Sequence, residues 1–180
     1  MAGTSGSGSI SGSISGVKRK IVVCIDGSDC SVNALEWYLN NLRKPDDTVV
    51  LLQVTSRGVG GMSLPVDAPV DVPQNSFDNI VTSQSGNDDV YITELKESYS
   101  GILLDYECDP STCQFVSLND NSPGSAICKF AKQNGVHHIV IGTRGLGKIK
   151  RKFLGSVSDH VIHNSNSSVS IVPNNNPTPT

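Results

Sequence analysis

Five short runs of apolar, largely β-branched residues alternate along this chain with segments of helical periodicity. Runs of this kind predict buried strands, here at 20–25, 48–54, 114–118, 136–142 and 168–172. The segments between them repeat apolar residues at three- and four-residue spacing, as amphipathic helices do. Strands that alternate with helices form a parallel sheet covered on both faces. We therefore expect a single-domain α/β fold, with a five-stranded parallel sheet between two layers of helices.

Local signals predict several of the helix and strand boundaries. Ser28 or Asp29 can cap the first helix, and Pro123 suits the first turn of a later one, which Gly135 should end. A helical pattern also begins near Asp88. The last run, 168–172, alternates polar and apolar residues, which favours a strand at the edge of the sheet or at a subunit interface over a central strand.

The fourth expected strand leads into a glycine-rich, basic loop that runs from Gly142 through Arg144 and Gly145 to Gly147. The loop is followed by Gly155-Ser156, just before the last helical pattern. Glycine lets backbone N–H groups approach phosphate oxygens closely, and a helix start adds unpaired N–H donors and the positive end of a dipole. This stretch therefore predicts an anion site.

Two common phosphate motifs do not match this loop. Gly142 to Gly147-Lys148 has the glycine spacing of a P-loop, but the next residue is Ile149, where a magnesium-binding Ser or Thr is required. The dinucleotide pattern G-x-G-x-x-G fails as well, because Lys150 stands where the third glycine is needed. The anion site must therefore be of another kind.

Ligands of parallel sheets bind beyond the carboxyl ends of the strands. That rule brings Asp26-Gly27-Ser28, Val54 and the Gly142 loop to one rim. The Asp26 carboxylate can accept hydrogen bonds from ribose hydroxyls or an adenine amine, or it can help to cap the first helix. Val54 can offer backbone groups to a base edge, or its side chain can belong to the core.

Basic residues crowd the window 144–152. A charge run usually forms a solvated surface, but its place between two glycine signals favours contact between Arg144 and a polyphosphate. Ser156 and Asp159 have the spacing of a capping box. The Ser156 hydroxyl and the N–H groups of 155–158 could cap the helix and also contact phosphate.

Composition limits the classes of function. The chain has 180 residues and a net charge of −3, so nothing global points to nucleic acid or to a membrane surface. Five scattered cysteines without a C-x-x-C motif indicate reduced thiols. No apolar run is long enough to span a bilayer or to serve as a signal segment, so we expect a soluble, cytoplasmic protein. His160 and His163 have metal-ligand spacing but no cysteine or carboxylate partners, so no metal site is assigned.

Three segments lack the signals of packed structure. Residues 1–16 are nearly all Gly, Ser and Ile, and 174–180 are Asn, Pro and Thr, so we expect both tails to be disordered. Residues 57–87 are rich in glycine and proline and are expected to form a mobile surface insertion. The domain itself should cover 17–173.

The spacing Gly142-x-x-Gly145, nine residues, then Gly155-Ser156 resembles the nucleotide-binding signature of the universal stress protein family. The opening strand 21–25 with Asp26-Gly27-Ser28, and the closing 169–173, look like the same family. The resemblance covers about 17–173. It departs from the family at His137-His138, where an acidic-apolar pair is common, and in the long insertion at 57–87.

The resemblance implies a Rossmann-like sandwich of the adenine nucleotide alpha hydrolase type, usually a homodimer joined through the last strand, here with Val169 and Ile171. Members with this signature bind ATP, and Mg2+ is a candidate companion ion. By carry-over, Asp26 faces the nucleoside within the turn that includes Gly27 and Ser28, and Val54, Ile141 and Gly142 lie near the base or sugar. The implied phosphate-binding residues are Arg144, Gly145, Gly155, Ser156, Val157 and Ser158.

Two classes of function remain open from the sequence. One is an ATP-binding regulatory protein of the stress response, with at most slow hydrolysis. The other is a dimeric interaction module in which nucleotide binding is weak or absent. No residue is a convincing general base for attack on a phosphate, so no catalytic residue is assigned.

Overall fold

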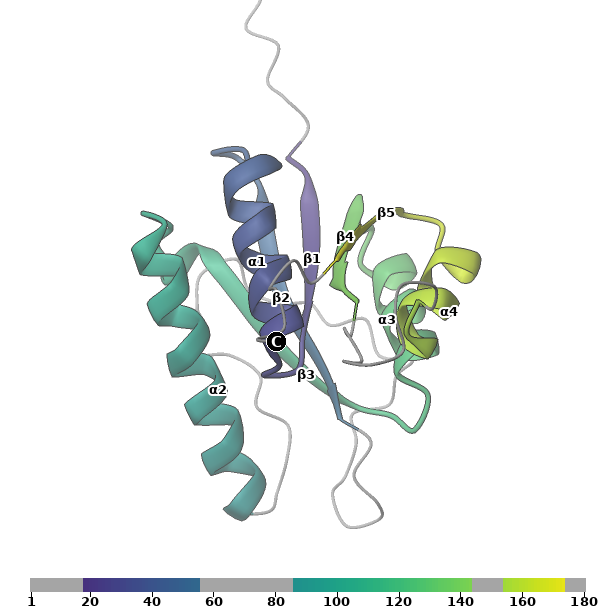
Figure 1. The fold of residues 1–180 in the computed structure, drawn as a ribbon, viewed down its shortest axis with the longest axis horizontal. Helices are drawn as coiled ribbons and strands as arrows, with labels where there is room; N and C mark the ends of the chain where they lie inside the picture. Colours follow the sequence, from purple (N-terminus) through teal and green to yellow (C-terminus); the bar gives the residue numbers. More distant parts are fainter. Residues whose placement is uncertain (1–17, 56–85, 144–153, 174–180) are drawn as a thin grey trace, which may run out of the picture.

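The computed structural model describes residues 18–55, 86–143 and 154–173. It confirms the expected α/β architecture: one five-stranded parallel sheet with α1 and α2 on one face and α3 and α4 on the other (Figure 1). A single-turn 3-10 helix, η1, precedes the third strand. The elements are β1 (Lys20–Ile25), α1 (Asp29–Asn41), β2 (Thr48–Thr55), α2 (Gly86–Asp105), η1 (Pro110–Thr112), β3 (Cys113–Asn119), α3 (Pro123–Gln133), β4 (His138–Gly142), α4 (Ser156–Asn164) and β5 (Ser168–Val172).

The order of the strands across the sheet is β3-β2-β1-β4-β5. The chain moves outward from β1 through β2 to β3, and then returns to the other side of β1 for β4 and β5. Strand order therefore reverses between β1 and β4, which lie side by side with Val22 paired to Ile139. In a parallel sheet, a crevice forms beyond the carboxyl ends of the two neighbouring strands at which strand order reverses. The predicted edge position of β5 is confirmed.

Two hydrophobic cores flank the sheet, because successive strand residues point to opposite faces. The core under α1 and α2 contains the large, fully buried Tyr38, Tyr99 and Phe115. The core under α3 and α4 contains Phe130 and Ile139. Central parallel strands buried on both faces explain why β1 and β2 read as continuous apolar runs.

The predicted boundary signals are largely confirmed. Ser28 is the N-cap of α1 and accepts a hydrogen bond from the Ser31 backbone N–H. Pro123 is the first residue of α3, and Gly135 follows that helix with a φ of 60°, the left-handed conformation that glycine adopts most easily.

Other boundaries differ from the expectation. Helix α2 begins at Gly86, so residues 86 and 87 belong to a helix and not to the expected insertion. Strand β4 begins at His138 rather than Val136, and β3 is longer at both ends. The predictions for 1–16, for 57–85 and for the tail 174–180 fall outside the described residues.

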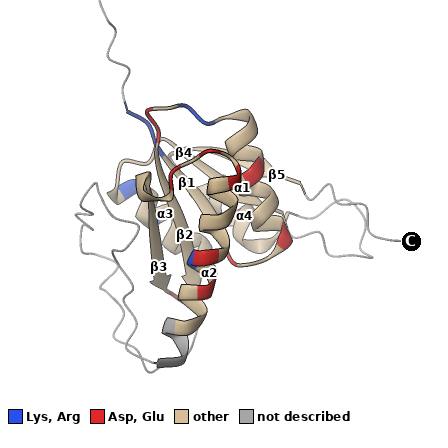
Figure 2. Cartoon of the chain, turned by 90° about the vertical axis from the view of Figure 1, so that its left-hand side faces the viewer, with Lys and Arg blue, Asp and Glu red and all other residues tan. Residues whose placement is uncertain are grey.

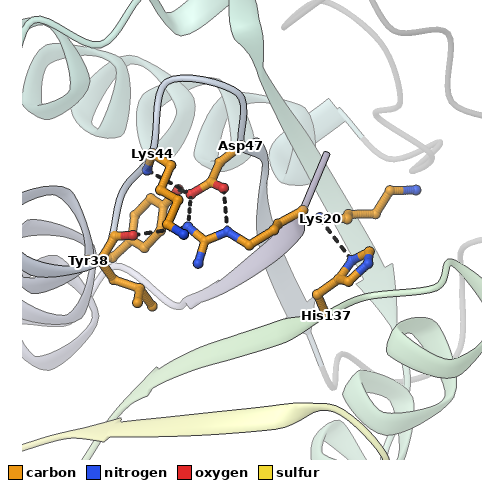
Figure 3. Close-up of polar contacts among 7 residues, drawn as sticks. Lys20, Tyr38, Lys44, Asp47 and His137 are labelled. Atoms are coloured by element: carbon orange, nitrogen blue, oxygen red, sulfur yellow. Dashed lines mark hydrogen bonds and ion pairs between the residues drawn. The ribbon is translucent and has the colours of Figure 1, made fainter. Parts of the chain in front are cut away.

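Charged residues at the start of β1 lie beside the acidic turn that leads into β2 (Figure 2). Here the Arg19 guanidinium donates two hydrogen bonds to the Asp47 carboxylate, at 2.8 and 2.6 Å. The same carboxylate accepts from the Tyr38 hydroxyl at 2.9 Å and from the Lys44 backbone N–H at 2.9 Å (Figure 3). Asp47 thus ties together β1, α1 and the turn before β2.

The unusual His137 lies at the same end of the sheet. The ring Nδ1 of His137 accepts a hydrogen bond from the Lys20 backbone N–H at 3.1 Å (Figure 3). The backbone N–H of His137 donates to the Lys20 carbonyl at 2.9 Å. The neighbouring His138 ring contacts the Ser170 hydroxyl on β5 at 2.9 Å. Both histidines therefore have a structural role in joining β4 to the strands beside it.

No helix in the described parts of the chain is long and apolar enough to cross a membrane. Over the same residues, no group of three or more His, Cys, Asp or Glu side chains is arranged to hold a metal ion.

Replacement of Gly101 by alanine is expected to raise the free energy of unfolding by about 1 kcal/mol. Gly101 lies inside α2, is exposed, and a Cβ atom built on it meets nothing within 4 Å. Alanine therefore restricts the unfolded chain without causing a clash. Urea unfolding followed by circular dichroism measures the change, and equal or lower stability would contradict the described course of α2.

Candidate functional site

A cavity of about 350 Å3 opens at the carboxyl ends of β1, β2 and β4. It is completed by the first residues of α1, α3 and α4, and therefore lies where strand order reverses. Nine of the sequence-predicted site residues line it: Asp26, Ser28, Val54, Ile141, Gly142, Gly155, Ser156, Val157 and Ser158. Gly27 lies in the same turn as Asp26 and Ser28, while Arg144 and Gly145 fall outside the described residues.

The turn after β1 is held by its own side chains. An Asp26 carboxylate oxygen accepts hydrogen bonds from the Ser28 backbone N–H at 3.0 Å and from the Ser28 hydroxyl at 2.5 Å. Gly27, between them, has a φ of 78°, which side chains with a Cβ rarely adopt. The predicted capping of α1 by Asp26 is not observed, because Ser28 is the N-cap residue. Asp26 instead accepts hydrogen bonds from that serine, and its side chain is exposed at the rim of the cavity.

Helix α2 supports this turn from behind. The Tyr99 hydroxyl lies 2.7 Å from the Ser31 hydroxyl, which in turn donates to the Ser28 carbonyl at 2.8 Å. Tyr91 donates to the Asp26 carbonyl at 3.4 Å. Burial, opposed in part by the Ser31 hydrogen bond, raises the pKa of Tyr99, so this hydroxyl stays neutral. The sequence pattern does not reveal this contact, because the partners are 68 residues apart.

The opposite side of the cavity is the start of α4. Gly155 is the N-cap residue, and because it has no side chain it makes no capping hydrogen bond to the helix end. The first backbone bond within the helix runs from the Asp159 N–H to the Gly155 carbonyl at 2.9 Å. The N–H groups of Ser156, Val157 and Ser158 precede that bond, so they have no partner within the helix and are available to an anion.

The predicted capping box of Ser156 and Asp159 is wrong. Ser156 is the first residue of α4 rather than its cap, so its hydroxyl is not in the capping position. The buried Ser158 hydroxyl instead donates back to the Gly155 carbonyl at 2.9 Å. The Ser156 side chain, exposed at the cavity, is therefore free of a capping role.

The end of β4 closely approaches the start of α1. A Cβ atom built on Gly142 would lie 2.3 Å from the Cys30 carbonyl oxygen and 2.7 Å from its carbonyl carbon. Only glycine fits such a contact between two backbones. Gly155 is different, because the nearest atom to a Cβ built there is the Ser158 hydroxyl oxygen at 3.6 Å, an ordinary contact distance.

The walls of the cavity are largely apolar. Besides Val54 and Ile141 they include Cys24, Leu52, Pro123 and Ile127, of which sequence reasoning assigned none to the site. Pairing of Cys24 with Leu52 in register places both on one face, a signal that appears only once the register is known. Burial raises the pKa of the Cys24 thiol to about 12, so this wall is uncharged.

The described lining of the cavity carries one carboxylate, that of Asp26, and no lysine or arginine. An anion in this part of the cavity would therefore be held by backbone N–H groups and hydroxyls. An apolar pocket with a carboxylate at one rim and a helix start at the other suits a ligand with a flat ring, a sugar and a negatively charged end.

Comparison with known proteins extends these observations. A family model described as "Universal stress protein family" matches residues 18–75 and 93–173. The chain is 25% identical over 163 residues to Universal stress protein PHOS32 of Arabidopsis thaliana, with 82% of this chain and 62% of that protein covered. It is 29% identical over 154 residues to Universal stress protein YxiE of Bacillus subtilis, covering 86% of this chain and 98% of that one.

A solved structure has the same fold. The universal stress protein from Archaeoglobus fulgidus in complex with dAMP aligns with a TM-score of 0.56 and 18% identity, over 87% of this chain and 98% of that chain. At this identity the likeness concerns the fold alone. The family model covers well over half of the residues, and the chain therefore belongs to the universal stress protein family.

Proposed function

We propose that this protein binds ATP in the cavity between β1 and β4 and acts as a regulatory protein of the stress response. The observation that carries the proposal is the position of that cavity, between the Asp26 turn and the N–H groups at the start of α4 that have no partner within the helix. Its volume of about 350 Å3 lies within the range of small-molecule sites. The Archaeoglobus fulgidus protein of the same family was solved with dAMP, which supports an adenine nucleotide.

Each part of the nucleotide has a counterpart in the cavity. The exposed Asp26 carboxylate is a hydrogen-bond acceptor suited to ribose hydroxyls. The apolar walls formed by Val54, Ile141, Leu52 and Ile127 suit an adenine ring. Gly142 at the end of β4 lets the Cys30 carbonyl of α1 approach closely, which brings the strand end and the helix start together at the rim of the cavity.

We assign the triphosphate to the start of α4. There Gly155, Ser156, Val157 and Ser158 supply backbone N–H groups and the Ser156 hydroxyl. Positive charge would come from the loop that contains Arg144 and Gly145, and Mg2+ is a candidate companion of the phosphates. No described residue is assigned as a general base, so the proposal is one of binding, with at most slow hydrolysis.

We further propose a homodimer joined through β5. This strand pairs with β4 on one side only among the described residues, so its other edge offers N–H and carbonyl groups to a second copy. Val169 and Ile171 pack partly against the core under α3 and α4. The five cysteines are free thiols, which fits work in a reducing compartment, and we propose the cytoplasm.

Titration calorimetry with ATP and Mg2+ tests the binding proposal. Wild type is expected to bind, and Gly155→Val to bind at least about tenfold more weakly, because the added carbons obstruct the helix start where the phosphates are placed. Folding should be retained, since a Cβ at Gly155 meets only Ser158 Oγ at 3.6 Å. Gly101→Ala, in open space on α2, is the control and should bind as wild type does.

The possible results separate the two classes of function. Binding by wild type that Gly155→Val leaves unchanged would refute the assigned site. No binding by wild type would refute the nucleotide proposal and favour a dimeric interaction module. Sedimentation equilibrium then tests the dimer separately, and a monomer at all concentrations would refute the β5 interface.

A further inference from the structure

Two cysteines, Cys108 and Cys113, lie on either side of η1, between the end of α2 and the start of β3. They are at the amino end of β3, and therefore at the opposite end of the sheet from the cavity. Both are buried, at 3% and 1% exposure. Their sulfur atoms are 3.9 Å apart and share a hydrogen bond. All five cysteines fall within the described residues, and among them Cys108 and Cys113 are the pair whose sulfur atoms lie within hydrogen-bonding distance.

We propose that Cys108 and Cys113 are a thiol-oxidation site, at which a hydroperoxide converts the pair into a reversible disulfide in the folded protein. The sulfurs need to approach by only about 2 Å to reach the bonded distance. The five-residue separation of the cysteines means that one short loop supplies both groups. This proposal is independent of nucleotide binding.

The backbone around Cys108 is held in place by neighbouring groups. Glu107 has a φ of 53°, and the Cys108 N–H donates to the Leu103 carbonyl at 2.8 Å, so the chain turns sharply at the end of α2. Arg43 donates to the carbonyls of Tyr106 and Glu107 at 3.2 and 3.4 Å. The guanidinium therefore lies against the turn that carries Cys108.

The two thiols differ in their tendency to ionise. The hydrogen bond from Cys113 lowers the pKa of Cys108 and Arg43 lowers it further, against the opposing effect of burial. The hydrogen bond to Cys108 and burial raise the pKa of Cys113. Because the thiolate is the reactive form, Cys108 is the first residue to be oxidised, and Cys113 is the thiol that closes the disulfide.

The reaction balances with hydrogen peroxide as the oxidant. The Cys108 thiolate attacks one oxygen, the O–O bond breaks, and the departing hydroxide takes up the proton that Cys108 gave to solvent, leaving a sulfenic acid and one water. The Cys113 sulfur then attacks the Cys108 sulfur, and the S–O bond breaks. Hydroxide leaves with the proton of Cys113 as a second water. Two thiols are oxidised and one peroxide is reduced.

Peptide mapping of the native protein tests the site. The protein is treated with hydrogen peroxide, its remaining thiols are blocked with N-ethylmaleimide, and it is cut before aspartates, which separates 105–108 from 109–119. The proposal expects these fragments to stay joined, with a mass lower by two hydrogens than their reduced sum, and to separate after dithiothreitol. Cys30→Ser and Cys128→Ser should leave this product unchanged.

A second measurement tests the role of Arg43. Arg43→Gln should slow disulfide formation several-fold at neutral pH. At alkaline pH, where Cys108 is ionised with or without Arg43, its rate should approach that of wild type. Lys44→Gln, an exposed neighbour, is the control and should match wild type throughout. Fragments that separate after peroxide treatment, or a Cys108 that ends as sulfinic acid with Cys113 still blocked by maleimide, would overturn the proposal.

Discussion

Replacement of Gly142 by alanine is expected to lower the free energy of unfolding by about 3 kcal/mol. The new Cβ would lie 2.3 Å from the carbonyl oxygen of Cys30 and 2.7 Å from its carbonyl carbon. These are backbone atoms near the start of α1, so no side-chain rotation can relieve the clash. Either α1 must shift away from the sheet or β4 must end earlier, and both changes disturb the buried core and the cavity together.

The same substitution at Gly155 is the matched control. Both glycines line the cavity, but a Cβ on Gly155 meets only Ser158 Oγ, at 3.6 Å. The free energy of unfolding of Gly155→Ala should therefore lie within about 0.5 kcal/mol of the wild-type value. Urea unfolding monitored by circular dichroism compares the two variants. If Gly142→Ala were as stable as Gly155→Ala, the close approach of β4 to α1 would be wrong.

The contrast between these glycines shows what sequence patterns can predict. The spacing of Gly142 and Gly155 indicated one site, because both signals stand at the ends of recognisable elements. The spacing did not show why each position requires glycine. One glycine avoids a clash between α1 and β4, and the other leaves the start of α4 uncovered. That difference depends on the distance between elements 112 residues apart, since Gly142 meets Cys30.

The fold was predictable because its signals are local. Buried parallel strands are continuous apolar runs, and Pro123 and Gly135 mark helix ends through their own backbone preferences. Strand order and register are set by contacts distant in sequence, so the alignment of Cys24 with Leu52 and the cavity walls that follow from it were missed. The capping box failed for a different reason, because a two-residue spacing pattern cannot show that the helix starts at Ser156 itself.

Replacement of Asp47 by alanine is expected to lower the free energy of unfolding by about 3 kcal/mol. The Asp47 side chain is only 2% exposed, and it accepts hydrogen bonds from Arg19, Tyr38 and the Lys44 N–H. Its removal leaves the Tyr38 hydroxyl without its acceptor and leaves the Arg19 guanidinium with the Leu42 carbonyl in place of the carboxylate. Asp46→Ala is the control: Asp46 is exposed, and the change should cost less than about 0.5 kcal/mol.

The contribution of Asp47 should also depend on pH, which distinguishes its charge from its packing. Burial alone would raise the pKa of Asp47, but hydrogen bonds from Arg19, Lys44 and Tyr38 outweigh it and hold the pKa below its usual value. An aspartate in the unfolded chain has a pKa of about 3.9. The stabilisation by the Asp47 charge is therefore complete at pH values above this pKa, and it is lost as the pH falls through the lower pKa of the folded state. Asp47→Asn keeps the shape but cannot ionise, so its stability deficit relative to wild type should be constant near neutral pH and shrink below about pH 4. A deficit that stayed constant down to acid pH would show that Arg19 stabilises the carboxylate no more in the folded state than water does in the unfolded chain.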